Sequence, residues 1–368
     1  MGPFAGQILS DLGADTIKVE PLDGDVGRQA QPGAEAGMGA MYVNNNRNKR
    51  VIALDLKSTE GKKVMDRLLA WSEVFLHNMR MDAIDRLGLT FAHAVQVNPQ
   101  LIYCSVLGFG QGGRYRGRPA FDDVIQAACG LAGLSRQFGD EPRFIPTIIA
   151  DKVGALYAVY GVLAALLSRA RGNQSAINVE APMFEALVSF LLNEHLADAT
   201  FSAGQDAIGY GRIFDVNRRP HRTKDGWIVC LTIGAPLYRR WAKLMGEEHW
   251  LTDPRFKDDI SRGNNGAVIS ERMARWCLDH TTAEAMEILG KAKIPAAPVL
   301  KPQQTLDDPH IRAMGFFQPV DYPGMPRPAP LAKVPVWLSE TPGSIRRRPP
   351  TVGEHTDRIM SELGFAAP

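Results

Sequence analysis

One run of twenty residues, 148–167, constrains this chain more than any other segment. It carries charge only at Asp151 and Lys152 and is otherwise almost entirely apolar. A helix that is apolar on every face is normally buried inside a sizeable domain. The run contains Gly154 and Gly161 and is flanked by charge, so it predicts a core helix and not a membrane span.

Asp151 stands at the head of this apolar helix. The first turn of a helix leaves backbone N–H groups unpaired and carries partial positive charge, which stabilises a carboxylate as an anion. Two interpretations of Asp151 follow from the residues alone. One is an ordinary N-cap, which the local sequence favours; the other is an oxygen nucleophile in a site that excludes water.

The length of 368 residues exceeds the single-core limit of about 250–300 residues, so we expect two domains. The predicted large domain is Rossmann-like and takes residues 1–190 and 315–368. A smaller α+β domain spans 205–300, and linkers cover 191–204 and 301–314. Asp225-Gly226 marks a turn into a strand of the smaller domain, followed by helices near 236–245, 267–278 and 282–291.

Charge and cysteine content exclude several classes of protein. A net charge of +2 gives no electrostatic signature of nucleic-acid binding. The four cysteines lie far apart and have no histidines at ligand spacing, so we expect neither a disulfide framework nor a metal site. The chain opens without a basic segment followed by an apolar run, which argues against a secretory signal. We therefore expect a cytoplasmic protein.

The first half of the chain alternates between strand and helix patterns. Strands are predicted at 15–20, 50–56, 73–78 and 101–107, with helices at 4–12 and 58–72, the second capped by Ser58. This alternation predicts an α/β fold with a doubly wound, largely parallel sheet. Such chains more often begin with a strand, so we expect one upstream of Met1. Ligands bind at the carboxyl ends of parallel strands, which directs attention to the loops after Glu20, Asn78 and Leu107.

Two further segments carry chemistry-bearing residues. Residues 108–113 satisfy the GxGxxG pattern, but the following Arg- and Pro-containing sequence does not start a helix promptly. A dinucleotide site needs that helix, so a glycine loop close to a ligand is the better interpretation. Asp122 and Asp123 precede a helix predicted at 124–134; either can cap it, and Asp122 can also line a site.

Motifs along nearly the whole chain resemble the class III CoA-transferases, the family of formyl-CoA transferase and the carnitine CoA-transferases. They occur in the expected order, which makes the set more specific than any single motif. The matching segments are GPFAGQ at 2–7, DLGADTIKVE at 11–20, NKR at 48–50, LDLK at 54–57, NMR at 78–80, DRLG at 85–88, GFG at 108–110, RPAFD at 118–122, Asp151 and GEHTD at 353–357.

The resemblance implies that Asp151 is a nucleophile that forms an aspartyl–acyl anhydride and then an aspartyl-CoA thioester. It also implies an interlocked homodimer that uses CoA and acyl-CoA as substrates, with a small carboxylic acid as acceptor and no permanently bound cofactor. Substrate choice would depend on loops such as 204–212. The family's CoA-binding residues match Leu54, Lys57, Asn78, Met79 and Arg86.

Two alternatives remain open at this point. The first is an α-methylacyl-CoA racemase or related isomerase, in which Asp151 acts as a base. The racemase branch of the family carries a His where this chain has Phe121, which weakens that hypothesis because a racemase needs an acid or base on each face of the α-carbon. The second is a CoA-binding protein without catalysis.

Overall fold

The computed structural model describes residues 1–30, 32–33, 37, 39–135, 139–201 and 208–365. The chain forms two compact units. One contains Met1–Arg136, Glu141–Asn193 and His310–Pro368, and the other contains Gln137–Asp140 and Glu194–Pro309. Residues 204–207 of the loop expected to govern substrate choice lie outside the described residues.

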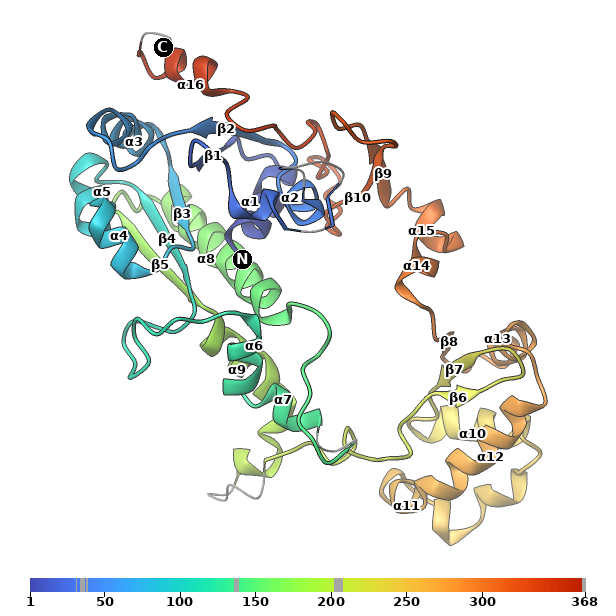
Figure 1. Ribbon diagram of the computed structural model, residues 1–368. Coiled ribbons are helices and arrows are strands. Elements are labelled where there is room, and N and C mark those ends of the chain that lie inside the picture. The colour runs from blue at the N-terminus through green and yellow to red at the C-terminus, as the bar shows by residue number, and fades with distance from the viewer. Residues whose placement is uncertain (31, 34–36, 38, 136–138, 202–207, 366–368) are drawn as a thin grey trace. The chain divides into compact units, whose positions relative to one another are not determined.

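Parallel strands form the centre of the first unit (Figure 1). Strand β1 (Thr16–Glu20) pairs with β2 (Lys49–Ala53), and β4 (Ile102–Leu107) lies between β3 (Val74–His77) and β5 (Ile177–Pro182). The predicted α/β class with parallel strands is confirmed. The expectation of a single sheet is wrong, because β1 and β3 form no ladder with each other and the described parallel strands divide into two sheets. The sequence patterns also missed β5.

Helices cover both faces of the sheet that contains β4, as the doubly wound pattern predicts. Alternate residues of a strand point to opposite faces, and here Tyr103 packs in one apolar core and Cys104 in another. The first core is covered by α3 (Thr59–Trp71), α4 (Met81–Leu87), α5 (Phe91–Val97) and α16 (Thr356–Glu362). The second is covered by α1 (Gly2–Asp11) and α8 (Ile149–Ala170).

Two glycines let α8 approach its neighbours closely. A Cβ at Gly161 would lie 2.5 Å from Val179 Cγ1 on β5. A Cβ at Gly154 would lie 3.1 Å from Met183 Cγ and 3.3 Å from Met1 Sδ. A residue with a Cβ at Gly161 would therefore require α8 or β5 to move, whereas at Gly154 a Cβ would make tight contacts with two methionine side chains.

The expectation that α8 is buried on every face is wrong for a single chain. Leu156, Tyr160, Leu163 and Leu167 form an apolar stripe that is between 37% and 57% exposed. By length and composition α8 is also the one described helix apolar enough to cross a membrane, and 39% of its most apolar window is buried. This is weak evidence for a membrane span, since the opposite face of the helix packs in a core with β4, β5 and α1.

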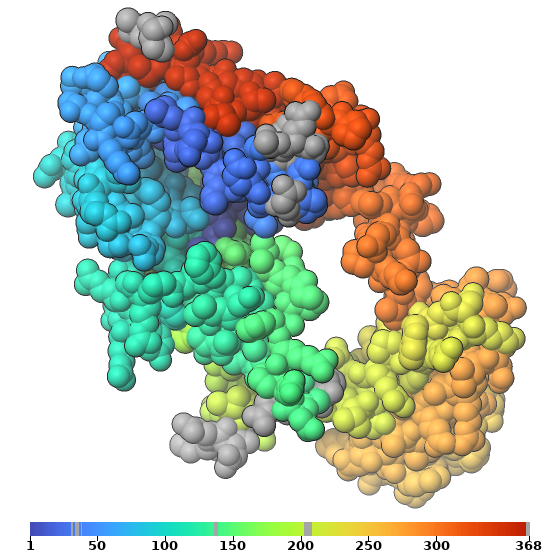
Figure 2. Space-filling view, in the orientation of Figure 1, coloured from blue at the N-terminus to red at the C-terminus, as the bar shows by residue number. Residues whose placement is uncertain are grey.

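The C-terminal segment returns to the N-terminal part of the same unit. Figure 2 shows its orange and red surface against the blue residues near the start of the chain. The buried Arg28 guanidinium lies 2.7 Å from Glu20 Oε1 and donates to the Pro350 carbonyl. This unit also contains η1 (Val26–Arg28), α2 (Ala40–Asn45), α6 (Asp122–Ala128), α7 (Leu131–Leu134), α9 (Met183–His195), α15 (Pro309–Ala313), β9 (Phe317–Val320) and β10 (Ala329–Ala332).

The second unit has an antiparallel sheet, with β7 (Trp227–Cys230) between β6 (His221–Arg222) and β8 (Ala296–Pro298). The turn predicted at Asp225-Gly226 joins β6 to β7 and is confirmed. Trp241, Phe256 and Met273 lie in its apolar core. Its helices are η3 (Ala197–Thr200), α10 (Ala235–Leu244), η5 (Glu248–Leu251), η6 (Pro254–Phe256), α11 (Asp259–Asn264), α12 (Gly266–Leu278), α13 (Thr282–Lys291) and α14 (Pro302–Thr305).

Candidate active site

The first turn of α8 is capped by a carboxylate from another helix. Its N-cap residue is Ile148, which has no side-chain hydrogen-bond acceptor. Asp122, the first residue of α6, supplies one: its Oδ1 accepts the N–H of Ala150 at 2.7 Å and the N–H of Asp151 at 3.1 Å. Gln126 Nε2 donates to Asp122 Oδ2 at 2.6 Å. The buried Asp122 side chain therefore holds the start of α8 in place.

The prediction that Asp151 is itself the cap is wrong. Asp151 is the third residue of α8, and in the described structure its carboxylate accepts no backbone N–H of that helix. Its Oδ1 lies 3.1 Å from the Met1 nitrogen, and the side chain is 28% exposed. The carboxylate thus lies in the positive field of the helix N-terminus but is not used in capping.

The start of α1 joins Asp151 to Asn78, a predicted CoA-binding residue. Gly2 follows Met1, and a Cβ at Gly2 would lie 3.0 Å from Asn78 Oδ1. Met1 itself packs on α8 at Gly154. The structure therefore brings the predicted nucleophile and the residue after β3 to the same end of α1, although 72 positions of sequence lie between them.

A buried lysine fixes the position of α1. Lys49 Nζ donates to the Pro3 carbonyl at 2.7 Å, to the Asn45 carbonyl at 2.8 Å and to Asn46 Oδ1 at 2.8 Å. Burial lowers the pKa of the Lys49 ammonium well below its ordinary value. Three acceptors satisfy its three donors, so this residue anchors the first turn of α1 against α2.

The other predicted CoA-binding residues follow the carboxyl ends of β2 and β3. Leu54 is buried and Met79 half-buried in the core beneath this edge. Lys57 is exposed in the turn before α3, and its backbone N–H donates to Asp55 Oδ1. Arg86 on α4 is 67% exposed and lies 3.0 Å from Asp82. Two cations are thus available to solvent beside apolar side chains.

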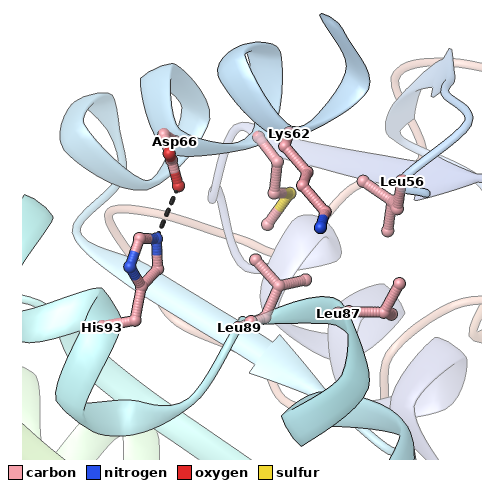
Figure 3. Close-up of a pocket in the computed structure, with 8 residues that line it drawn as sticks. Leu56, Lys62, Asp66, Leu87, Leu89 and His93 are labelled. Carbon is pink, nitrogen blue, oxygen red and sulfur yellow. Dashed lines mark hydrogen bonds and ion pairs between the residues drawn. The ribbon is translucent and has the colours of Figure 1, made fainter. Parts of the chain in front are cut away.

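A cavity of about 190 Å³ lies beside these residues (Figure 3). Leu56 and Leu87, the sequence neighbours of Lys57 and Arg86, contribute to its apolar lining. Figure 3 shows polar groups at its edge, where His93 Nε2 lies 2.7 Å from Asp66 Oδ1 and Lys62 projects from α3. Sequence reasoning missed this cavity because its lining comes from several separate elements.

His77 closes β3 beneath the same edge. Its Nε2 lies 3.0 Å from Ser105 Oγ on the neighbouring strand β4. Burial lowers the pKa of His77 to about 4, so the imidazole is neutral at neutral pH. This packed imidazole contacts the neighbouring strand, and its neutral form avoids a buried charge.

The GxGxxG segment does not form a dinucleotide site. No helix begins within residues 108–113, all of which are described. The N–H of Gly110 donates to Glu185 Oε1 at 3.1 Å, and the N–H of Gln111 donates to Glu180 Oε1 at 2.8 Å. Carboxylates therefore occupy backbone donors that a pyrophosphate would need, in agreement with the interpretation from sequence.

Comparison with known proteins identifies the family of this chain. The family model described as CoA-transferase family III matches residues 1–356. The chain belongs to CoA-transferase family III. It is therefore an enzyme of a family whose members use CoA thioesters as substrates.

Curated members of CoA-transferase family III match almost the full chain. A succinyl-CoA–L-malate CoA-transferase beta subunit from Chloroflexus aurantiacus is 30% identical and covers 98% of this chain and 90% of its own. A formyl-CoA:oxalate CoA-transferase from Bradyrhizobium diazoefficiens is also 30% identical, with 99% and 91% covered. These names share the transfer of CoA but differ in the acids concerned.

Solved structures agree with the family assignment. A CAIB/BAIF family protein from Brucella suis is 27% identical and superposes with a TM-score of 0.83 over 98% of this chain and 95% of its own. The protein Rv3272 from M. tuberculosis gives the same identity and TM-score over 97% and 94%. The mixed α/β architecture with parallel sheets is thus shared across the family.

Proposed function

We propose that this protein transfers CoA from an acyl-CoA donor to a carboxylic acid acceptor, with Asp151 as the nucleophile. The observation that carries the proposal is the start of α8. Asp122 accepts the backbone donors there, so the Asp151 carboxylate caps no N–H of its own helix and contacts only the Met1 nitrogen among the described residues. The carboxylate lies in the first turn of α8, where the partial positive charge of the helix faces it.

The proposed reaction proceeds through two covalent states of Asp151. A carboxylate oxygen attacks the thioester carbon, the C–S bond breaks, and CoA leaves as a thiolate. The thiolate attacks Asp151 Cγ of the resulting anhydride, and the donor acid leaves as a carboxylate. The same two steps then run in reverse with the acceptor. Its carboxylate attacks the aspartyl-CoA thioester, which releases the CoA thiolate and forms a new anhydride. The thiolate attacks the acceptor's acyl carbon of that anhydride, which gives the new acyl-CoA and releases the Asp151 carboxylate. Each step exchanges one anion for another, so no proton transfer is needed.

CoA is proposed to lie along the carboxyl ends of β2 and β3. Lys57 and Arg86 are suited to its phosphates, because both are cationic and exposed there. Leu54 and Met79 supply apolar surface beneath them. Asn78 extends this surface toward Asp151, since it lies against Gly2 at the same end of α1.

The proposed assembly is a homodimer that covers the apolar stripe of α8. Four large side chains spaced along one helix face are exposed, and burying such a surface stabilises association. The chain leaves the first unit after Asn193 and re-enters it at His310. An interlocked arrangement of the two subunits is part of the same proposal. Light scattering should give the mass of a dimer, and Tyr160→Glu should shift it toward the monomer. An unchanged mass for this variant would argue against the α8 stripe as the interface.

Trapping the covalent intermediates tests the nucleophile directly. The protein is incubated with acyl-CoA and quenched with hydroxylamine or borohydride, and its peptides are then analysed by mass spectrometry. We expect a hydroxamate or a reduced side chain at Asp151. Full transfer activity in Asp151→Ala, or modification at another carboxylate only, would overturn the proposal.

The isomerase alternative receives no support from the residue beside Asp122. Phe121 is 80% exposed and carries no proton donor or acceptor. A racemase needs an acid or base on each face of the α-carbon. Exchange of the α-proton in deuterated water, without exchange of CoA between acids, would favour the isomerase over the transferase.

A further inference from the structure

A second groove lies at the opposite edge of the parallel strands from the proposed CoA site. It has a volume of about 430 Å³ and lies wholly within the first unit. Residues 13–15 and Asn48 immediately precede β1 and β2, and Trp71 ends α3 three residues before β3, so they mark the amino ends of these strands. The C-terminal residues Arg346, Arg347, Arg358 and Glu362 complete the lining, together with Arg50.

The groove carries an excess of positive charge. Four guanidinium groups, those of Arg50, Arg346, Arg347 and Arg358, face two carboxylates, those of Asp15 and Glu362. Arg50 lies 2.7 Å from Asp15 Oδ2 and also pairs with Glu362, which in turn accepts from Arg358 at 3.0 Å. The carboxylates are therefore already neutralised within the network, and two positive charges remain in excess.

Arg347 is the cation most available to a ligand. Its exposed guanidinium has no hydrogen-bond or ion-pair partner among the described residues. Arg346 is nearby, with one arm donating to the Ser10 carbonyl at 2.7 Å. Its Nη1 donates to Ser344 Oγ at 3.5 Å, so Arg347 offers more unpaired donors to an anion than Arg346 does.

Asn48 holds the backbone of these two arginines in place. Its Oδ1 accepts the N–H of Arg346 at 2.6 Å and of Arg347 at 2.9 Å, while its Nδ2 donates to Asp11 Oδ1 and to the Ser344 carbonyl at 2.7 Å. Asn48 is buried and adopts a φ of 64°, a left-handed conformation that is uncommon outside glycine. Four hydrogen bonds keep it there, so the two cations project from a fixed backbone.

We propose that this groove binds a nucleoside di- or triphosphate. The phosphates would bind Arg347 and Arg346, since guanidinium forks suit phosphate oxygens. The base would lie on Trp71, whose side chain lines the groove and is 52% exposed. A simple anion would use the charge but leave this indole and most of the 430 Å³ unfilled, whereas a nucleotide uses all three features.

Calorimetric titration with ADP, run on protein saturated with CoA, tests the proposal without interference from the carboxyl-edge site. We expect saturable binding that weakens about 10-fold or more in Arg347→Gln, because a hydrogen bond between charged groups is lost. Trp71→Leu should weaken it about 10-fold through loss of base stacking. Arg348→Gln is the matched control, since Arg348 pairs with Glu354 at 2.8 Å and does not line the groove.

The outcomes distinguish a nucleotide from a simple polyanion. Quenching of Trp fluorescence by ADP in the parent, but not in Trp71→Leu, would support the assignment. Absence of saturable ADP binding would overturn it, as would equal weakening in Arg347→Gln and Arg348→Gln. Tripolyphosphate that binds as tightly as ADP, with no effect of Trp71→Leu, would overturn the assignment of a nucleotide. CoA transfer should persist in Arg347→Gln, so failure here is distinct from failure of the transferase proposal.

Discussion

The starts of α8 and α13 place a carboxylate at the same position in the helix and use it differently. Asp151 comes three residues after the N-cap Ile148, and Glu284 comes three residues after the N-cap Thr281. In α13 the cap is local: Glu284 Oε2 accepts the Thr281 N–H at 2.8 Å, and Thr281 Oγ1 accepts the Glu284 N–H at 3.3 Å. In α8 the acceptor is Asp122, from a different helix.

The difference shows how a helix start can either use its own carboxylate or leave it available. Backbone and hydroxyl hydrogen bonds from Thr281 lower the pKa of Glu284 and bind its oxygens. Asp151 receives the field of the helix without those bonds, because Asp122 accepts the N–H groups of Ala150 and Asp151. Because the cap of α8 comes from another helix, the Asp151 carboxylate is not needed to stabilise the start of its own helix.

Asp151→Asn should have the largest effect on the rate of CoA transfer. If the Asp151 carboxylate is the nucleophile, CoA transfer should fall by a factor on the order of 10³ or more, since an essential covalent group is lost. The matched variant Glu284→Gln should leave transfer unchanged. Rates measured by mass spectrometry of acyl-CoA products check both. Equal losses of CoA transfer in the two variants would contradict the distinction drawn between the carboxylates of α8 and α13.

Asp122→Ala should give the next largest effect. It removes the shared cap, so transfer should fall on the order of 10²-fold as the first turn of α8 shifts. The free energy of unfolding should fall by about 1–2 kcal/mol. Asp122→Asn keeps an oxygen acceptor for the two N–H groups and should recover most of the stability. Urea unfolding and steady-state kinetics of both variants check this; a stable but equally inactive Asp122→Asn would show that its charge, and not its capping, matters.

The smallest expected effect belongs to α13. Glu284→Gln should lower the Tm of the protein by roughly 1–3 °C, because one bond of a surface capping box is weakened. The lowered pKa of Glu284 means that its contribution is present above its ordinary pKa of 4.5 and is lost as the pH falls through the folded value. The Tm difference between parent and variant should therefore shrink in acid. A difference that grows below pH 4.5 would contradict this sign.

Local features of the fold could be predicted from sequence. Alternating strand and helix patterns located β1 to β4, and Ser58 was correctly predicted to cap α3, where its Oγ accepts the Gly61 N–H. These features depend on residues within a few positions of one another, so the local pattern contains the necessary information. The position of Asp151 in the first turn of α8 could be predicted for the same reason.

Features that depend on contacts between distant segments could not be predicted. Asp122 and Asp151 are 29 positions apart, and nothing in either local pattern indicates that one caps the helix of the other. The apolar run of α8 could not reveal that its Tyr160 face stays exposed in one chain, because composition does not show what a face packs against. The groove around Arg347 forms where the C-terminal segment packs against the N-terminal part of the chain, a contact that sequence periodicity cannot predict.

The close approach of α8 to β5 at Gly161 couples the position of the whole helix to this one contact. Gly161 is ten residues from Asp151, which is about 15 Å along a helix axis. A methyl group at Gly161 would clash with Val179 and push this part of α8 away from β5. Because a helix moves as a rigid body, its first turn, which contains Asp151, would be displaced as well. The position of the Asp151 carboxylate, the proposed nucleophile, therefore depends on the absence of a side chain about three turns further along the helix.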